Sequence, residues 1–206
     1  MDEHALSIII PTLGRSTLAL SLDSLLAQTD QHWRALVGFD GVPLMEVKDD
    51  SRITYYEFEK VGKENHGGEV RNRLIKYSDT SWVCFLDDDD TFRRDCVEKI
   101  QQEIRDRPKA DVIVFRMSYD PVDLHVLPLK NETTIKLNQV GISFAVRKAF
   151  LQDKNLWFEP GAYEDFGILT RIQAAGGSVV FINYIGYNVK FKKSWGRHGG
   201  RAPGNA

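Results

Sequence analysis

The sequence predicts an α/β fold with a mostly parallel, twisted sheet flanked by helices, and three observations favour it. Leu6–Pro11 is a β-branched apolar run that ends in proline, which is typical of a buried strand. A helical segment and a second apolar run, Trp33–Phe39, follow at the spacing of a right-handed βαβ unit. A third apolar run, Trp82–Leu86, predicts a short buried strand and ends abruptly in four aspartates, Asp87–Asp90.

The composition is that of an ordinary globular chain of 206 residues, with 42% hydrophobic and 27% charged residues. This length lies within the range of a single α/β domain. A net charge of −2 gives no general basic surface for a nucleic acid, although Lys190–Arg201 is locally basic. We therefore expect no nucleic-acid partner.

Cysteine usage and the absence of apolar spans predict a cytoplasmic protein. Cys84 and Cys96 form neither a disulfide framework nor a metal-ligand spacing, so both are interpreted as structural thiols in a reducing compartment. The acidic start Met1–His4 is followed by only a short apolar run, which predicts no signal peptide. No stretch is long enough to span a bilayer, and peripheral contact with a membrane stays compatible with the sequence.

The first predicted helix begins at a cap formed by Ser16 or Thr17 and ends at Ala27, with leucines spaced along one face. The second strand ends in the turn Asp40-Gly41. Because both strands belong to one βαβ unit, we expect Asp40 to lie on the same sheet edge as Thr12.

The next elements continue the strand and helix alternation. They are a strand at Ile53–Phe58, a helix at Glu69–Tyr77, the strand before the aspartates, a helix at Thr91–Arg107 and a strand at Asp111–Met117. In the helix before Pro108, apolar residues recur at Cys96, Val97, Ile100 and Ile104, which predicts one buried face.

The later part of the chain is more variable. Its segments are an irregular stretch at Asp120–Lys136, a strand at Gly141–Val146, a short helix at Arg147–Leu151, an amphipathic helix at Tyr163–Ala175 and a last strand at Ser178–Tyr187. No internal repeat or linker separates two cores. We therefore predict a single domain over residues 1–206, with a nucleotide-type βαβ half (1–117), a more variable half (118–190) and a basic tail (191–206).

The run Asp87–Asp90 needs a chemical explanation. Adjacent carboxylates repel one another, and burying them costs several kcal/mol each unless something compensates the charge. A divalent cation would do so, and hard oxygen ligands suit Mg²⁺ or Mn²⁺, which also bind phosphates. Ligands of open α/β sheets bind beyond the carboxyl ends of the strands, where this cluster falls. The alternative is a solvated acidic loop that caps the next helix, with Asp90 as the cap of a helix beginning at Thr91.

Five stretches in order resemble glycosyltransferases of the GT-A fold, specifically the large inverting group called family 2. The match is imperfect, because Phe39 and Val42 replace the usual Asp and Ser of one motif and Val70 replaces a common Ala. The stretches are SIIIPTLGR at residues 7–15, the strand ending Phe39-Asp40-Gly41, Gly67–Asn72, FLDDDD at residues 85–90, and Tyr163–Phe166 with Arg171 downstream.

The resemblance implies a donor site for a nucleotide-diphosphate sugar with Mn²⁺ or Mg²⁺. Asp87 and Asp89 match the family's D-x-D motif and are the expected metal residues, with Asp89 the direct ligand and Asp87 at the ribose or a metal-bound water. Asp88 or Asp90 could shift this register, and Asp88 is counted among the nucleotide-sugar contacts. His198 is the candidate for a late histidine metal ligand, with a solvated basic tail as the alternative.

Three further residues are implied on the donor side. Thr12 and Asp40 would hold the nucleoside base, and Arg71 would contact the base or the diphosphate. The alternatives are that Asp40 only forms its Asp-Gly turn and that Arg71 is a surface residue in a helix salt bridge.

On the acceptor side, Asp165 matches the position of the catalytic base, with Glu164 as its partner in the family's E-D motif. An inverting transfer needs a carboxylate against the acceptor hydroxyl, opposite the leaving group. The alternative is that both acids only favour the first turn of a helix. Trp157 and Phe158, which precede this motif, are interpreted as packing beneath the helix rather than as a sugar-stacking wall.

The predicted function is therefore a metal-dependent, inverting hexosyl transfer in glycan biosynthesis. The donor would be a nucleotide-diphosphate sugar, with a UDP-sugar favoured, and the acceptor a glycan, a lipid-linked sugar or a protein-linked sugar. One alternative is a sugar nucleotidyltransferase, although such enzymes usually carry a glycine-rich basic loop where this chain has Thr12–Arg15. The other is a non-catalytic domain that binds a sugar nucleotide or a glycan.

Overall fold

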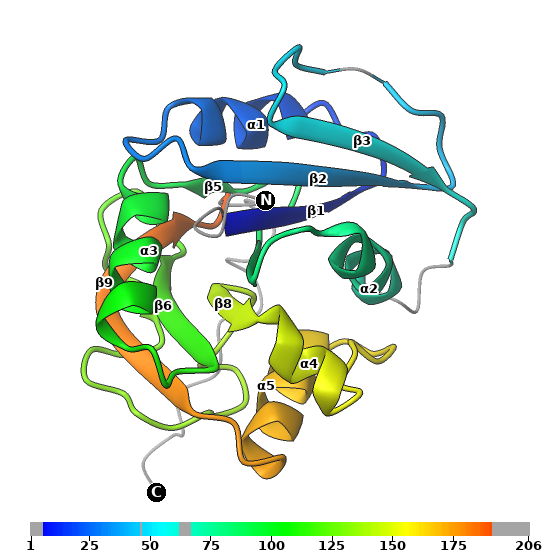
Figure 1. Ribbon diagram of the computed structural model, residues 1–206. Helices are drawn as coiled ribbons and strands as arrows, with labels where there is room; N and C mark the ends of the chain where they lie inside the picture. The colour runs from blue at the N-terminus through cyan, green and yellow to red at the C-terminus, as the bar shows by residue number, and fades with distance from the viewer. Residues whose placement is uncertain (1–5, 46, 62–66, 191–206) are drawn as a thin grey trace, which may run out of the picture.

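The computed structural model describes residues 6–45, 47–61 and 67–190. These residues form one nine-stranded sheet flanked by helices, which confirms the predicted α/β class (Figure 1). The strand order is β3-β2-β1-β4-β8-β6-β9-β5, with β7 beside β6.

The elements follow the predicted alternation along the chain. The strands are β1 (Leu6–Thr12), β2 (Trp33–Asp40), β3 (Ile53–Phe58), β4 (Trp82–Phe85), β5 (Thr91–Phe92), β6 (Val112–Ser118), β7 (Val126–Leu127), β8 (Phe144–Arg147) and β9 (Val179–Asn188). The helices are α1 (Leu18–Leu26), α2 (Gly68–Tyr77), α3 (Cys96–Asp106), α4 (Lys148–Asp153) and α5 (Glu164–Ala174).

The long strands all point the same way. β1 pairs in parallel with β2 and β4, and β2 with β3. β8 runs antiparallel to both β4 and β6, so β6 has the direction of β4, and β9 is parallel to β6. The carboxyl ends of β1, β2, β3, β4, β6 and β9 therefore meet at one edge, where ligands of such sheets bind.

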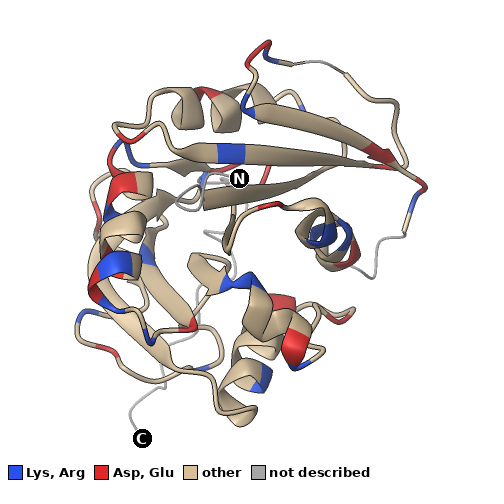
Figure 2. Ribbon diagram, viewed as in Figure 1, with Lys and Arg blue, Asp and Glu red and all other residues tan. Residues whose placement is uncertain are grey.

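Helices cover both faces of the sheet. α1 and α2 lie on opposite sides of the β1–β3 layer, and α3 lies beside β6 and β9 (Figure 1). Figure 2 shows strands mostly free of charged residues and helices α2 and α3 carrying both signs, as expected when only the outer faces meet water. α2 packs so closely on β2 that a Cβ at Gly38 would lie only 2.7 Å from Val70 Cγ1.

One predicted helix is shorter than expected. The helix expected at Thr91–Arg107 begins only at Cys96, because Thr91 and Phe92 pair with β9 instead. The Phe92 ring packs edge-on against Tyr187, and this burial outweighs the local helical pattern. The interpretation of Asp90 as a helix cap is therefore wrong, and Thr17, although at the cap position of α1, makes no side-chain cap hydrogen bond.

Both cysteines are buried free thiols, as predicted, and burial raises the pKa of each. Within the described ranges, no helix is both long and apolar enough to cross a bilayer. The division into one domain with two halves stays a prediction.

Candidate active site

The four aspartates form a tight turn directly beyond β4. The Asp90 N–H donates to the Asp87 carbonyl at 3.2 Å and closes the turn. The carboxylates then face different partners: the Asp87 side chain is 36% exposed, whereas that of Asp88 is 5% exposed. The turn therefore separates four like charges and lets the protein's own groups compensate them.

Asp88 is held from the end of β1. The Thr12 hydroxyl donates to Asp88 Oδ2 at 2.6 Å, and the Arg15 guanidinium contacts Asp88 Oδ1 at 2.8 Å and Asp89 Oδ2 at 3.3 Å. Burial raises the pKa of Asp88, while the Thr12 hydrogen bond and Arg15 act in the opposite direction. Arg15, to which we assigned no role from sequence, therefore links the SIIIPTLGR stretch to the acidic turn.

Arg71 joins the two predicted halves of the site. Its side chain is 4% exposed, with Nη2 at 2.6 Å from Asp87 Oδ1 and Nη1 at 3.0 Å from Glu164 Oε1. Two carboxylates raise the pKa of this buried guanidinium, although burial alone would lower it. The interpretation of Arg71 as a surface residue is wrong, and its predicted contact with a nucleotide stays a prediction.

Gly67 places Arg71 at this position. It has φ +84° before the first turn of α2, and a Cβ there would lie 3.1 Å from Pro11 Cγ. A side chain at this position would thus be strained by backbone conformation and by contact with β1.

Asp90 is anchored at the far side of the turn. Its carboxylate accepts the Lys190 N–H at 2.8 Å and is hydrogen-bonded by the Tyr187 hydroxyl. Tyr187 is fully buried at the end of β9, and its oxygen also accepts the Asp87 N–H at 3.1 Å. Burial, followed by the charge of Asp87, raises the pKa of Asp90 to about 7.

Asp165 lies in the first turn of α5, beside the residue that binds Arg71. Its Oδ1 accepts the Phe166 N–H at 2.7 Å. Burial and the neighbouring charge of Glu164 raise the pKa of Asp165 to about 6, although Arg71 acts in the opposite direction. A carboxyl with a pKa near the working pH is suited to take a proton from a hydroxyl.

A pair of amide hydrogen bonds fixes the chain segment in front of α5. Asn72 Nδ2 donates to the Phe158 carbonyl at 2.9 Å, and Asn72 Oδ1 accepts the Phe158 N–H at 2.8 Å. Phe158 is buried, which agrees with its interpretation as a packing residue. Trp157 lies against Lys76 of α2, with the Lys76 nitrogen 5.0 Å from the ring centre.

Asp40 lies at the same edge of the sheet as Thr12, as predicted, since Thr12 pairs with Phe39. Asp40 Oδ1 accepts the Val61 N–H at 2.7 Å, so it holds the chain beyond β3. This contact supports its role as a structural turn residue. Its predicted contact with a nucleoside base stays a prediction.

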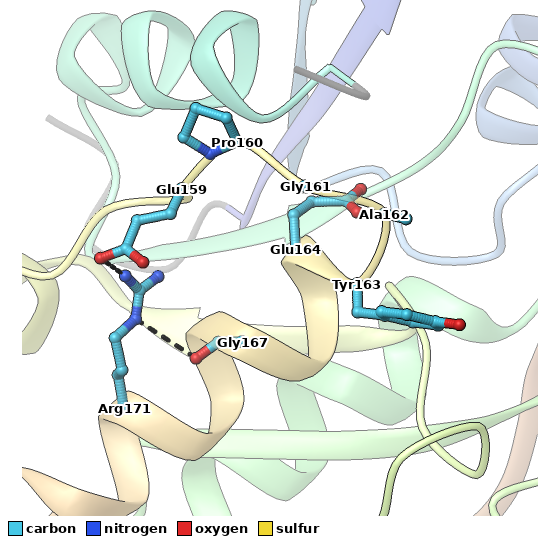
Figure 3. Close-up of a pocket in the computed structure, with 8 residues that line it drawn as sticks. All are labelled: Glu159, Pro160, Gly161, Ala162, Tyr163, Glu164, Gly167 and Arg171. Carbon is cyan, nitrogen blue, oxygen red and sulfur yellow. Dashed lines mark hydrogen bonds and ion pairs between the residues drawn. The ribbon is translucent and has the colours of Figure 1, made fainter. Parts of the chain in front are cut away.

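A pocket of about 240 Å³ opens beside Glu164 (Figure 3). The segment Glu159–Tyr163 and one face of α5 line it, with an ion pair between Glu159 and Arg171 on one side. A Cβ at Gly161 or Gly167 would meet no atom within 4 Å, so no packing clash requires either glycine, although the φ of +144° at Gly161 disfavours a side chain there. The open space beside Gly167 would admit a side chain into the lining of the pocket.

Most of the predicted residues are brought together. Hydrogen bonds and ion pairs connect Thr12 to Asp88, Arg15 to Asp88 and Asp89, and Arg71 to Asp87 and Glu164. His198 lies outside the described residues. We assigned no role to Arg15 or Tyr187 from the sequence, and the one available signal for Tyr187 was its position near the end of a strand that reaches the same edge.

The carboxylates of the acidic turn suit a hard divalent cation, although they do not form a complete site by themselves. Among residues 6–45, 47–61 and 67–190, no three His, Cys, Asp or Glu side chains are arranged as a ready metal site. Asp87 and Asp89 nevertheless offer carboxylate oxygens at the ligand-binding edge. Mg²⁺ is usually bound by one or two carboxylates plus substrate phosphates rather than by an all-protein cage, so the residues present fit such an ion.

The mostly parallel sheet with its flanking helices has the GT-A fold of glycosyltransferases, to which both a family model and solved structures are similar. The chain belongs to glycosyl transferase family 2, whose model matches residues 7–163. A solved structure of TarS from S. aureus in complex with UDP-GlcNAc is similar in fold, with a TM-score of 0.71 at 17% identity. That similarity covers 92% of this chain and 59% of TarS.

Two named relatives are similar in sequence. The processive diacylglycerol beta-glycosyltransferase of Mycoplasma genitalium is 28% identical over an alignment of 151 positions, which covers 61% of this chain and 44% of the relative. The Escherichia coli enzyme WfgD, a UDP-Glc:alpha-D-GlcNAc-diphosphoundecaprenol beta-1,3-glucosyltransferase, is 27% identical over 60% of this chain and 49% of its own length. Across the curated relatives, the chain spans between 18% and 61% of their length.

Proposed function

We propose that this chain transfers a sugar, with inversion, from a nucleotide-diphosphate sugar to a hydroxyl of a glycan, a lipid-linked sugar or a protein-linked sugar. The observation that carries the proposal is the buried Arg71 bridge, which fixes Asp87 on the donor side and Glu164, beside Asp165, on the acceptor side. A UDP-sugar is the favoured donor, because WfgD is named for UDP-Glc and TarS is solved with UDP-GlcNAc.

Asp165 is proposed as the base that takes the proton of the acceptor hydroxyl. Its carboxylate is partly desolvated, and its pKa of about 6 leaves it mostly ionised at neutral pH. Such a group accepts a proton as the hydroxyl attacks, while the donor's diphosphate leaves on the opposite side. Arg71, which is ion-paired with Glu164, lowers the pKa of Asp165 and so opposes the rise caused by burial and by the charge of Glu164.

The acidic turn is proposed to receive the diphosphate. Asp89 and Asp87 would hold Mn²⁺ or Mg²⁺, which would stabilise the negative charge of the departing nucleoside diphosphate. The Arg15 guanidinium lies 3.3 Å from Asp89 and its side chain is half-exposed, so a positive charge lies at the solvent side of the same turn. Thr12 fixes Asp88 and thereby the backbone course of the turn.

Asp89→Asn is expected to abolish metal-dependent stabilisation by the nucleotide. A ligand at about 100 times its dissociation constant stabilises a fold by roughly 2.7 kcal/mol, which shifts the melting temperature by several degrees. Thermal melting with UDP, GDP, dTDP and CMP, each with and without Mn²⁺, measures this shift. Asp79→Asn is the matched control, because Asp79 is a half-exposed surface carboxylate paired loosely with Arg34 at 3.8 Å.

The reaction products and the shifts in melting temperature distinguish sugar transfer from the alternative functions. Release of a nucleoside diphosphate supports sugar transfer, whereas release of pyrophosphate would indicate a nucleotidyltransferase. Nucleotide binding without turnover would indicate a non-catalytic binding domain. An unchanged shift in Asp89→Asn would remove the acidic turn from the donor site.

We propose the pocket beside Glu164 as the entry of the acceptor sugar, with the exposed Tyr163 ring at its rim. Gly167→Leu is expected to raise the KM for the acceptor about tenfold or more, because the leucine fills the pocket floor. Gly167→Ala is the matched control, since both substitutions improve helix propensity by roughly 0.8–1 kcal/mol and only leucine is bulky. Transfer to a panel of methyl glycosides is measured against donor hydrolysis in water, and equal kinetics in both variants would place the acceptor elsewhere.

A further inference from the structure

Tyr119 lies at the edge of the sheet where the acidic turn is found, and none of the roles described above involves it. It directly follows β6, whose carboxyl end lies at the same edge as that of β4. Its ring stacks on His125 with centres 4.9 Å apart, and its N–H donates to the His125 carbonyl at 2.8 Å. Asp120 caps the loop between them by accepting the N–H groups of Val122 and Leu124. The Tyr119 ring is thus held in one orientation.

The Tyr119 hydroxyl is hydrogen-bonded to a residue that lies beside Asp165. It donates to Met117 Sδ at 3.2 Å. A Cβ at Gly141 would lie 2.6 Å from that sulfur and 3.6 Å from Asp165 Oδ2, so Met117 and the base candidate border the same small space. Burial and the charges of Asp165, Asp90 and Asp87 raise the pKa of Tyr119 to about 12, so the phenol stays a hydrogen-bond donor at any working pH.

The acids near Tyr119 belong to both the donor side and the acceptor side of the proposed reaction. Asp87 belongs to the turn proposed to meet the diphosphate, and Asp165 is the proposed base. A sugar that is attacked by a hydroxyl at Asp165 and that leaves a diphosphate at the acidic turn must lie between these groups. A thioether is a weak acceptor, so the phenol can exchange its contact with Met117 for a sugar hydroxyl.

We infer that Tyr119 is a substrate-binding residue that donates a hydrogen bond to the transferred sugar of the donor. This inference rests on the proposed function and adds the contact that distinguishes the sugar nucleotide from the bare nucleotide. His125 and the Asp120 cap act as positioning groups, because they fix the ring rather than reach the sugar themselves.

Tyr119→Phe tests the inference, because it removes one oxygen and keeps the ring stacked on His125. The binding of UDP, UDP-glucose and UDP-N-acetylglucosamine is measured by thermal shift, and kcat and KM are measured for whichever sugar turns over. We expect unchanged UDP binding and a loss of about tenfold or more in kcat/KM for the sugar nucleotide. Tyr77→Phe, at an exposed tyrosine of α2, is the matched control and is expected to change neither.

The outcomes separate the inference from the proposed function. A kcat/KM within twofold of wild type would overturn the role of Tyr119, and so would an equal loss of UDP and UDP-sugar binding, which indicates a structural effect. Binding and turnover of UDP-sugars by the wild-type protein, with a loss of kcat/KM only in Tyr119→Phe, would support the inference. Wild-type protein that binds none of these three ligands and neither GDP nor dTDP would overturn the proposed function, and this inference with it.

Discussion

Asp165→Asn is expected to slow sugar transfer by about 10²- to 10⁴-fold while leaving nucleotide binding unchanged, because it removes the proposed general base. The asparagine side chain keeps the shape of the carboxyl and can still accept the Phe166 N–H. Steady-state transfer and UDP thermal shift are measured on the same preparation. Asp153→Asn, at an exposed carboxylate that ends α4, is the matched control and is expected to keep full activity.

The same residue predicts the pH dependence of transfer. The base works in its ionised form, and its pKa is raised to about 6. The rate is therefore expected to fall about tenfold per pH unit below pH 6 in wild type. The charged and titratable groups that face Asp165 are Glu164, Arg71, Asp87 and Tyr119, and none of them is replaced in this test. A rate that stays flat between pH 5 and pH 7 would contradict the assignment of Asp165 as base.

Stability gives an independent check, since the sign of the linkage is fixed. The pKa of Asp165 is higher in the folded chain than in the unfolded chain, so its contribution to stability is present at low pH and is lost as pH rises through about 6. At pH 8 the ionised carboxylate is therefore unfavourable in the fold. Asp165→Asn is expected to melt at or above the wild-type temperature there, so lost activity with an unchanged or raised melting temperature would be chemical rather than structural.

The sequence patterns predicted local features well and long-range contacts poorly. The buried strand before Asp87–Asp90 and the acid pair at Glu164 were visible because apolar runs, charges and helix starts are local signals. The burial of Arg71 was not, because its partner Glu164 lies 93 positions along the chain. The strand at Thr91–Phe92 was missed for the same reason, since only its pairing with the end of β9 makes it a strand.

Tyr119 and Tyr187 show a second limit. Each is an aromatic residue beyond or at the end of an apolar strand, and a hydrophobic pattern alone interprets such a residue as core. Only the strand directions place both at the edge where Asp87 and Asp90 lie. Functional residues of this kind follow from topology, which the local sequence pattern does not contain.

Arg71→Met is expected to destabilise the fold by about 3 kcal/mol, the lower end of the range for a broken buried ion pair, because Glu164 stays largely buried without its cation while the half-exposed Asp87 is partly solvated. This is a large part of the total for a domain whose unfolding free energy is typically about 5–15 kcal/mol. Denaturant unfolding measures the loss. Arg73→Met is the matched control on the same helix, since Arg73 is a surface residue paired with Glu69, and such pairs contribute about 0.3–0.5 kcal/mol.

Two further variants test whether the bridge also tunes the base. Arg71→Met combined with Glu164→Gln removes one of the uncompensated charges and is expected to recover part of the lost stability. Arg71→Lys keeps the charge but cannot contact both carboxylates in the same forked geometry. Because Arg71 lowers the pKa of Asp165, a weaker contact in Arg71→Lys should shift the acidic limb of the pH–rate profile to higher pH. A destabilised Arg71→Lys variant with an unshifted profile would leave Arg71 a purely structural clamp between the two halves of the site.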